Sequence, residues 1–482
     1  MPPVSRVLDE QPVPDLDTYA AAGGGSALKA ALRLGPAATI EEMEASGLRG
    51  RGGAGFPTGR KWRTVAEHAS DVIAATVVVN ASEGEPGSFK DRMLLRRNPY
   101  RILEGALVAA HTVRADSIVV ALKASFHPEL ARLRRAIDEI ETAGWTTGVG
   151  LAVCEGPSEY LYGEETALLE VLDGRAPFPR IAPPFRHGVE ELGTDPVSAA
   201  GSMLADPGPG TPAPPTLVNN AETMAQVALV LAHGPAWYRE LGTPDSPGTA
   251  VCTVSGSTRR HGVGEFPMGT PLCEVIEALG GGPRHGPVRA VLSGVAHPLL
   301  SPSDLDAPVS YEGMESAGSG LGAAGFIVFD ESDDLVAVAQ GVARFLAVES
   351  CGQCTPCKQD GLAIAEILDR LCRSEATEHD LTDLADRAAT VTDESRCYLA
   401  TQQQRVVGSL LRRFPESLAV CLRDAGRPPV DPVTIAPIVD LDGERATIDE
   451  SNRRKQPDWT YDEDFSGQSP ADRIDQRAPA AR

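Results

Sequence analysis

Four cysteines in the C-terminal third of the chain have a spacing that suits a metal cluster. Cys351, Cys354 and Cys357 recur at every third position, and Cys397 follows between two predicted helices. Three thiolates spaced in this way can surround one corner of a cubane, and a distant fourth can complete it, as in a single four-iron four-sulfur (4Fe-4S) cluster. Structural zinc is the alternative, although zinc sites usually combine paired Cys-x-x-Cys segments. We therefore predict a 4Fe-4S cluster on these cysteines.

The other potential metal ligands show no comparable pattern. Cys154, Cys252, Cys273, Cys372 and Cys421 have no regular spacing, and we interpret them as small buried residues. The nine histidines have no paired ligand spacing. Catalytic metal chemistry by histidine therefore has no support in the sequence.

A glycine-rich segment over residues 47–62 could hold a phosphate. Its glycines let the backbone approach a ligand and adopt positive φ, and its arginines and Lys61 add positive charge. Residues 50–55 also fit the G-x-G-x-x-G dinucleotide fingerprint, but that fingerprint follows a strand, and here the first strand is expected after the loop. Phe56 adds an apolar ring to this bare loop. A flat, phosphorylated ligand explains these features, and a flexible interhelical linker is the alternative.

Two polar segments directly follow predicted strands of a parallel sheet. Asn80–Arg92 comes after strand 75–79, and Glu155–Leu168 comes after strand 150–154. Ligands bind outside the carboxyl ends of parallel strands, where acidic side chains can accept hydrogen bonds from ribose hydroxyls. The first segment could instead be a solvated acidic turn. In the second, two glutamates could simply favour the helix dipole by about 0.3–1 kcal/mol each.

A fourth segment, Val218–Thr223, is ambiguous on its own. Its asparagine pair can cap the N-terminus of the helix predicted at 222–231, and this is the simpler interpretation.

The elements that must position these segments alternate between strand and helix in the first half of the chain. Strands are predicted at 75–79, 117–122 and 150–154 and helices at 39–46, 60–69, 128–141 and 163–172, a pattern typical of a parallel α/β sheet. A small mixed module fits strands 249–255 and 288–292 around helix 270–279. Four helices at 334–349, 357–373, 378–391 and 398–412 indicate a bundle. Residues 1–26 are expected to be an extended lead-in, and 176–216 a long wrapping loop.

Composition excludes several classes of protein. The chain has 482 residues, enough for roughly three or four domains. Its 44 basic and 67 acidic residues give a net charge of −23, which disfavours binding to a phosphate backbone, so nucleic acid is not an expected partner. No run approaches the roughly 18 apolar residues of a membrane span. Because the start also lacks the features of a secretory signal, we expect a cytoplasmic protein that meets membranes only through partners.

Taken together and in this order, the segments resemble the flavin-bearing NADH dehydrogenase subunit of respiratory complex I, also used as a diaphorase subunit in NAD-linked hydrogenases and formate dehydrogenases. The resemblance covers roughly residues 27 to 425. Its marks are Arg49–Trp62, Asn80–Arg92, Tyr160–Leu169, Val218–Thr223, and Glu349–Cys357 with Cys397. A joint match of this kind is far more specific than any one motif.

The resemblance implies the cofactors FMN and a 4Fe-4S cluster, with NADH as the electron donor. The residues implied for FMN are Gly50, Arg51, Gly52, Gly53, Lys61, Asn80, Gly163, Glu164, Asn219, Asn220 and Thr223. Those implied for NADH are Phe56, Glu85, Tyr160, Glu165 and Phe185. The cluster ligands are Cys351, Cys354, Cys357 and Cys397. No protein side chain is expected to act as catalytic acid or base, because the flavin carries the chemistry.

The expected fold class is α/β, with a Rossmann-like parallel-sheet FMN domain, a ubiquitin-like α+β module and a C-terminal four-helix bundle. The domains are predicted at 1–60 (N-terminal extension and glycine-rich flavin loop), 61–240 (FMN and NADH), 245–330 (ubiquitin-like module), 334–425 (cluster bundle) and 426–482 (disordered polar tail). The expected partners are a thioredoxin-like two-iron two-sulfur subunit and further iron-sulfur subunits of one complex.

Two residues depart from the family's pattern. Ser82 stands where the family usually has aspartate, and Ala182 stands where it usually has lysine before Pro-Pro-Phe. Loss of a charged hydrogen bond worth about 1.5–3 kcal/mol could weaken nucleotide binding by one or two orders of magnitude.

The leading hypothesis is a subunit that passes hydride from NADH to FMN and single electrons to the cluster, with quinone, hydrogenase or formate dehydrogenase chemistry elsewhere in its complex. The alternatives are a carrier that no longer accepts NADH and a zinc-stabilised interaction protein.

Overall fold

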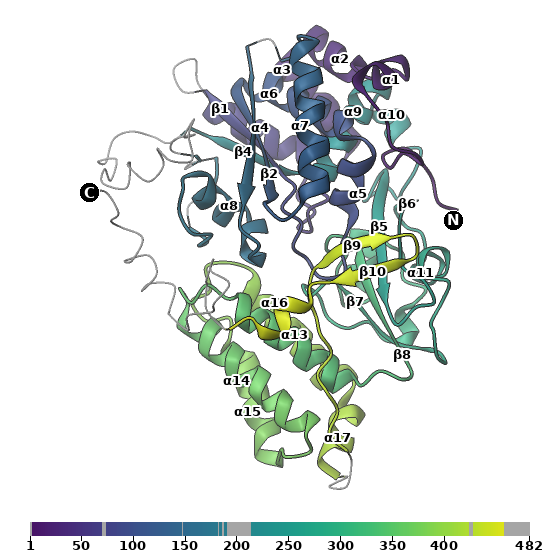
Figure 1. Ribbon diagram of the computed structural model, residues 1–482, viewed down its shortest axis with the longest axis vertical. Coiled ribbons are helices and arrows are strands. Elements are labelled where there is room, and N and C mark those ends of the chain that lie inside the picture. The colour runs from purple at the N-terminus through teal and green to yellow at the C-terminus, as the bar shows by residue number, and fades with distance from the viewer. Residues whose placement is uncertain are drawn as a thin grey trace, which may run out of the picture.

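The computed structural model describes residues 2–69, 74–146, 148–181, 183–185, 188–189, 214–423 and 428–456. Figure 1 shows a sheet domain covered by helices at one end, a helical region at the other and a second sheet beside their junction. The predicted wrapping loop is described only at its two ends, and Ala182 and the final residues 457–482 lie outside the described ranges. The domain limits given above stay a prediction.

The N-terminal lead-in is more structured than its composition indicates. Helix α1 (Leu16–Ala21) begins at an Asp15 cap, and α2 (Ser26–Leu34) follows it. The buried Glu104 carboxylate accepts hydrogen bonds from the Tyr19 hydroxyl and from backbone N–H groups of this segment, which fixes it to the domain. The prediction of an extended lead-in is therefore wrong from Leu16 onward, because a distant buried acid supplies order that local sequence does not reveal.

The first sheet is parallel, as the alternation of strands and helices predicted. Its strand order is β3-β2-β1-β4. The strands are β1 (Ala75–Asn80), β2 (Ala115–Lys123), β3 (Gly150–Gly156) and β4 (Thr216–Asn220). β1 pairs with β2 on one side and with β4 on the other, so Val77 lies opposite both Ile118 and Leu217. Because all four strands run the same way, their carboxyl ends share one edge.

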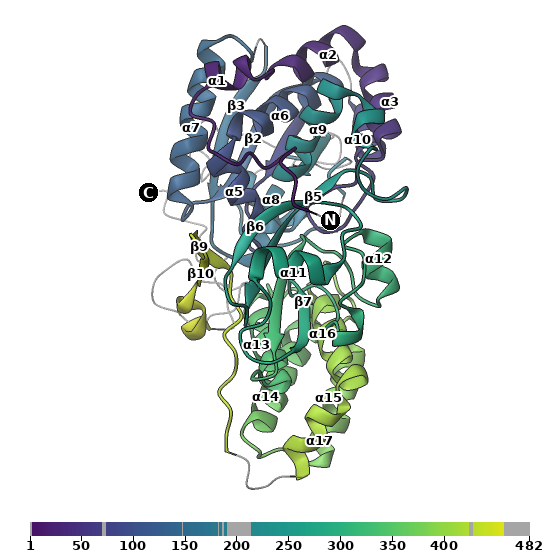
Figure 2. The ribbon, with the colours of Figure 1, turned by 90° about the vertical axis from the view of Figure 1, so that its right-hand side faces the viewer.

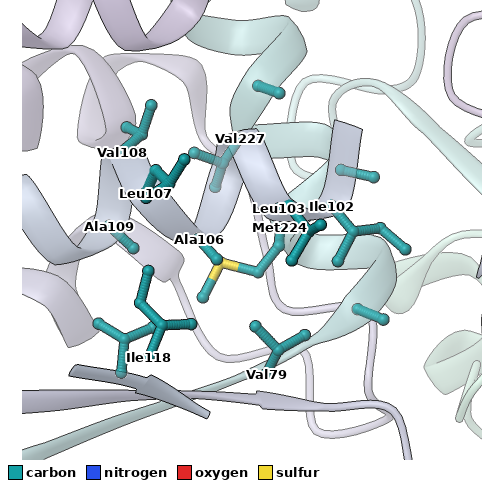
Figure 3. Close-up of a cluster of buried hydrophobic side chains, with 14 of the residues drawn as sticks. Val79, Ile102, Leu103, Ala106, Leu107, Val108, Ala109, Ile118, Met224 and Val227 are labelled. Carbon is teal, nitrogen blue, oxygen red and sulfur yellow. The ribbon is translucent and has the colours of Figure 1, made fainter. Parts of the chain in front are cut away.

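Helices cover both faces of this sheet. Val77 and Val79 face the larger helical layer, while Val78 and Val119 face α8 (Glu165–Leu172) and the 3-10 helix η1 (Tyr160–Gly163). Figure 3 shows side chains of α6 (Pro99–Val113) packed between the sheet and α9 (Ala221–His233). The other helices of this domain are α3 (Pro36–Ser46), α4 (Thr58–His68), α5 (Lys90–Arg97), α7 (His127–Thr142) and α10 (Pro235–Tyr238).

The second sheet is mixed and has the strand order β6-β5-β8-β7. Its strands are β5 (Thr249–Gly256), β6 (Gly262–Pro267), β7 (Val288–Ser293) and β8 (Gly325–Asp330), of which only β5 and β8 pair in parallel. Helix α11 (Leu272–Gly280) packs on it, with η2 (Pro302–Asp304) and α12 (Tyr311–Ser316) in the connection to β8. The predicted small mixed module is therefore present.

The C-terminal helical region contains the four predicted helices and one more. These are α13 (Leu335–Glu349), α14 (Thr355–Cys372), α15 (Glu378–Thr390), α16 (Leu399–Arg413) and α17 (Pro415–Arg423), which share one apolar core. In the described part of the chain, no helix is long and apolar enough to cross a membrane.

The segment after the bundle is not a disordered tail throughout. Residues 438–454 form the hairpin β9 (Ile438–Asp442) and β10 (Arg445–Ile448), followed by η3 (Glu450–Arg454). Ile438 and Leu441 pack against the buried Phe89 of the sheet domain. The disorder predicted from 426 onward is therefore wrong for this segment. Its few apolar residues suffice because they are buried against another domain.

Candidate functional site

The carboxyl edge of the parallel sheet brings the predicted flavin segments together. Asn80, at the end of β1, donates from Nδ2 to the Gly163 carbonyl at 2.9 Å, which joins the segment Asn80–Arg92 to the segment Glu155–Leu168. The Asn80 Oδ1 atom accepts a 2.7 Å hydrogen bond from the Ser82 hydroxyl. Ser82 is fully buried beside Gly163. The serine that departs from the family pattern thus holds an asparagine of the site in one orientation.

A buried group of charges joins the segment Val218–Thr223 to the same edge. Lys90 Nζ lies 2.8 Å from Asp91 Oδ1 and 3.0 Å from Glu222 Oε2, and all three side chains are almost fully buried. Asn220, at the end of β4, donates to Asp91 at 2.6 Å and accepts from Lys90 at 3.1 Å. Burial alone would lower the pKa of Lys90, but the carboxylates raise it above its usual range. The segments Asn80–Arg92 and Val218–Thr223 contain these three residues, but the sequence does not reveal that Lys90 pairs with Glu222, because the two lie more than a hundred residues apart.

Arg51 anchors the glycine-rich loop to the protein. Its backbone N–H donates to Thr223 Oγ1 at 2.9 Å. Its guanidinium is buried and donates to the Thr249 and Pro247 carbonyls and to the Tyr238 hydroxyl. This positive charge is therefore used inside the protein.

The rest of the loop lies across the carboxyl edge of the sheet. A Cβ on Gly52 would lie 3.1 Å from the Asn220 Cβ, and Gly53 has φ +121°. Phe56 is 47% exposed, with the Arg60 guanidinium 5.9 Å from its ring centre. A flexible linker is excluded as an interpretation, because the backbone of Arg49 pairs with that of Pro57 inside the loop and the backbone of Gly53 pairs with that of Gly322 outside it.

Lys61 forms an ion pair with the segment Glu155–Leu168. Its Nζ lies 2.6 Å from Glu165 Oε1 at the start of α8, and both side chains remain partly exposed. This pair joins α4 to the first turn of α8, so a ligand that enters between them meets one positive and one negative charge. The resemblance implies Lys61 for FMN and Glu165 for NADH, and the structure places the two side chains in direct contact.

Several predicted ligands also have structural partners. The Glu164 carboxylate caps α8 by accepting from the N–H groups of Thr166 and Ala167, and burial raises its pKa. Asn219 Oδ1 accepts from the Trp62 indole at 2.9 Å. Of the asparagine pair, Asn220 caps α9 as the simpler interpretation expected, whereas Asn219 bonds Trp62.

Glu85 and Tyr160, both predicted for NADH, contact each other. The Tyr160 hydroxyl donates to Glu85 Oε2, and the Val295 N–H donates to Glu85 Oε1 at 2.7 Å. Gln402 of α16 donates to the Tyr160 hydroxyl at 2.8 Å. Burial raises the pKa of Glu85. The sequence does not reveal Gln402, because an uncharged residue inside a helix carries no local signal.

Phe185 lies apart from this pair. Its ring packs against His68, at the opposite end of α4 from Lys61, with ring centres 5.2 Å apart. Of the predicted nucleotide residues, Phe185 therefore lies at the C-terminal end of α4, away from the Glu85–Tyr160 pair.

The four predicted cluster cysteines line one cavity. Cys351, Cys354, Cys357 and Cys397 surround it together with Leu161, Pro179 and Leu399. Within the described ranges, no group of three or more histidine, cysteine or acidic side chains is arranged to hold a single metal ion. Thiolates on one zinc lie about 3.8 Å apart, because each Zn–S bond is about 2.3 Å, whereas a cube of iron and sulfide separates them further. The donor set therefore fits a 4Fe-4S cluster better than zinc.

The surroundings of the sulfurs suit a buried cluster. Burial raises the pKa of Cys351 and raises that of Cys357 to about 11, so the thiolates need a positive centre to compensate their charge. Ser350 Oγ lies 3.4 Å from Cys357 Sγ, and Gln353 Nε2 lies 3.5 Å from Cys351 Sγ. Polar contacts to sulfur are one of the features that tune cluster potentials.

A single turn of 3-10 helix separates the two sites. In η1, Tyr160 contacts Glu85 on the nucleotide side, and the next residue, Leu161, lines the cysteine cavity. The predicted flavin residue Gly163 ends the same turn. One turn thus carries Tyr160, predicted for the nucleotide, Gly163, predicted for the flavin, and Leu161 of the cysteine cavity.

Comparisons with known proteins agree with this arrangement. Residues 43–229 match the Nuo51 FMN-binding domain, and residues 337–420 match the NADH-ubiquinone oxidoreductase-F iron-sulfur binding region. The NADH-quinone oxidoreductase F 2 subunit of Rhizobium meliloti is 35% identical over 417 residues, covering 83% of this chain and 94% of that protein. The chain belongs to the family of NADH-quinone oxidoreductase F subunits.

Further members of this family show the same extent of similarity. The NADH-quinone oxidoreductase F subunit of Streptomyces coelicolor is 35% identical over 436 residues, covering 89% of this chain and 92% of its own length. Among solved structures, a chain of an NAD+-reducing NiFe hydrogenase in the H2-reduced state superposes with a TM-score of 0.73 at 34% identity, covering 88% of this chain and 67% of that one. The protein therefore has an FMN-binding domain and a 4Fe-4S region. Its residues after 420 lie beyond both matched family regions.

Proposed function

We propose that this protein oxidises NADH through FMN held at the carboxyl edge of the parallel sheet and passes the electrons to a 4Fe-4S cluster on Cys351, Cys354, Cys357 and Cys397. The observation that carries the proposal is the position of η1, because Tyr160 contacts Glu85 on the nucleotide side while Leu161 lines the cysteine cavity. Transfer of single electrons from a flavin to a cluster requires that the two cofactors lie close together, and η1 borders both proposed sites.

The chain's own residues bind and orient the reactants. The backbone of Gly50, Gly52 and Gly53 and the Lys61 ammonium would hold the phosphate end of FMN, and Asn80, Asn219 and Asn220, which lie along the carboxyl edge of the sheet, would contact the rest of the cofactor. The Phe56 ring, which is partly exposed, is suited to stacking on NADH. When bound, FMN supplies the ability to take up a hydride and release its electrons singly.

We infer that the Ser82 departure preserves flavin binding. The Ser82 hydroxyl holds the Asn80 side chain, so the polar function at this position is retained without a negative charge. For Ala182 the proposal rests only on the family pattern. Because this chain lacks the lysine that the family usually has there, its affinity for NADH is lower than with lysine, while flavin binding is unaffected.

The family assignment makes the chain one component of a multi-subunit complex. We propose that a thioredoxin-like two-iron two-sulfur subunit and further iron-sulfur subunits accept its electrons, and that it meets a membrane only through them. Quinone is the favoured terminal acceptor because the matched relatives are NADH-quinone oxidoreductases. An NAD-linked hydrogenase is the second candidate, supported by the similarity to the hydrogenase chain.

The decisive experiment is anaerobic purification followed by visible and electron paramagnetic resonance (EPR) spectra before and after addition of NADH. Flavin bands that bleach with NADH, together with a cluster signal, are the expected result. Flavin bands that do not respond to NADH would reassign the chain as a carrier that no longer accepts the nucleotide. A colourless protein containing zinc would overturn the assignment of both cofactors.

A further inference from the structure

The C-terminal segment 428–456, here called the strap, contacts all three parts of the fold. Figure 2 shows it rising along the helical region to the β9–β10 hairpin beside α5. Val433 N–H donates to the Ala337 carbonyl of α13. The Ile438 carbonyl accepts from Arg92 of α5 at 3.2 Å. In the mixed-sheet module, the His261 ring accepts from the Ala446 N–H at 2.8 Å.

The strap approaches α13 more closely than a side chain would permit. A Cβ on Gly341 would lie 2.0 Å from the Val433 carbonyl oxygen, so only glycine allows this crossing. Further along α13, the Arg344 guanidinium donates to the carbonyls of Asn452, Arg453 and Lys455 at 2.9–3.0 Å. The last turns of α13, which lead directly to Cys351, are therefore attached to the end of the strap.

Lys455 places a positive charge in a buried acidic region. Its Nζ lies 2.7 Å from Glu349 Oε1, with side-chain exposures of 14% and 4%. Glu349 Oε2 accepts a 3.0 Å hydrogen bond from the Tyr160 N–H. Glu159 is also buried here, and Lys123, whose Nζ donates to the Ser158 carbonyl, is the other cation. Without Lys455, two buried carboxylates would share one lysine, which is costly in a region poor in water.

We propose that Lys455 is a positioning residue for electron transfer: through Glu349 it fixes the backbone of Tyr160 and the chain that enters the cysteine motif. The Glu349 carboxylate links η1 to the cysteine motif, because Glu349 contacts Tyr160 in η1 and stands just before Cys351 in the chain. The strap thereby sets the position of the nucleotide-contacting turn relative to the cluster loop. The kinetic part of this inference rests on the proposed role of Tyr160 with NADH, whereas its structural part does not.

The test compares Lys455→Gln with Lys455→Arg and with Arg454→Gln. The last variant is the matched control, because it removes the same charge one residue away from an exposed side chain. In Lys455→Gln, hydrogen exchange of the Tyr160 amide should accelerate by about tenfold, as expected for the loss of a charge-assisted contact. The KM for NADH should rise with little change in kcat measured with ferricyanide, and the EPR signal of the cluster should shift. Lys455→Arg should restore all three.

The outcomes separate this inference from the proposed function. The positioning role would be overturned if the Tyr160 amide of Lys455→Gln exchanged at the same rate as in the wild type. An equal acceleration in Arg454→Gln would overturn it as well. If wild-type protein does not oxidise NADH, the proposed function fails, but the exchange comparison still decides the role of Lys455. Should Lys455→Gln fold poorly, Glu349→Gln provides the second variant, with the same faster exchange at Tyr160 expected.

Discussion

Cys354 is the proposed cluster ligand whose removal best separates the two redox sites. It stands at the N-cap of α14 and lines the cysteine cavity, whereas the residues predicted for the flavin lie at the carboxyl edge of the parallel sheet. Cys354→Ala should abolish the EPR signal of the cluster while NADH still bleaches the flavin. Cys273→Ala, at a cysteine outside the motif, should leave both signals intact. A full cluster signal in Cys354→Ala would contradict the ligand assignment.

His297 should make stability depend on pH. Burial lowers its pKa to about 4, and the Arg405 charge adds to this effect. The unfolded chain binds a proton near pH 6.5, whereas the folded protein does so only near pH 4. The folded state is therefore stabilised fully above pH 6.5, and this contribution falls as pH drops towards 4. At pH 5 the loss is about 2 kcal/mol at most.

The measurement is the free energy of unfolding at pH 7 and pH 5 for the wild type and His297→Gln. The variant should show a smaller decrease between the two pH values, even if it is less stable overall. An equal decrease in both proteins would show that other groups cause the pH dependence.

At the scale of elements, η1 connects the nucleotide residues to the cluster cavity through the Tyr160 hydroxyl. That hydroxyl joins Glu85 to Gln402, and so links the sheet domain to α16. Tyr160→Phe leaves the buried Glu85 with one donor fewer, which should cost about 1–3 kcal/mol of stability. The KM for NADH should increase by about tenfold or more.

The control for this variant is Tyr398→Phe, since Tyr398 is 44% exposed and lies just before α16. Thermal denaturation and NADH kinetics with ferricyanide measure the two effects. Equal behaviour of the two variants would argue that the Tyr160 hydroxyl has no special role in the link between the sheet domain and the bundle.

At the scale of the whole molecule, the strap should hold the domains together. Truncation after residue 427 removes its apolar contacts with Phe89 and its polar contacts with Arg92, Arg96 and Arg344. Because several buried contacts are lost at once, we expect a loss of at least about 3 kcal/mol and faster proteolysis between domains. Truncation after residue 456 keeps the strap and is the matched control. Equal melting temperatures for the two truncations would refute the prediction.

Much of the site could be predicted from local sequence because its chemistry depends on spacing. The cysteine motif places three thiolates in one short segment that leads into α14, and β-branched runs such as Ala75–Val79 form buried strands in almost any parallel sheet. Polar residues directly after such strands must then meet at one edge, as Asn80 and Asn220 do. The helices of the bundle follow from apolar periodicity in the same way.

Other features required the tertiary structure because their partners are distant in the chain. The use of the Arg51 charge inside the protein depends on Thr249 and Tyr238, which no local pattern links to the glycine loop. Gln402 and Lys455 gain their roles only when α16 and the strap pack against η1 and α13.

The sequence by itself indicated an iron-sulfur cluster and a phosphorylated ligand, because both need particular residue types at fixed separations, and the joint resemblance of the segments to a family implied that the ligand is FMN. Tertiary structure alone decided how these sites are coupled and whether the polar end of the chain is ordered. Burial of a few apolar residues such as Ile438 against a distant surface, and pairing of Lys455 with Glu349, are long-range effects that no short window of sequence contains.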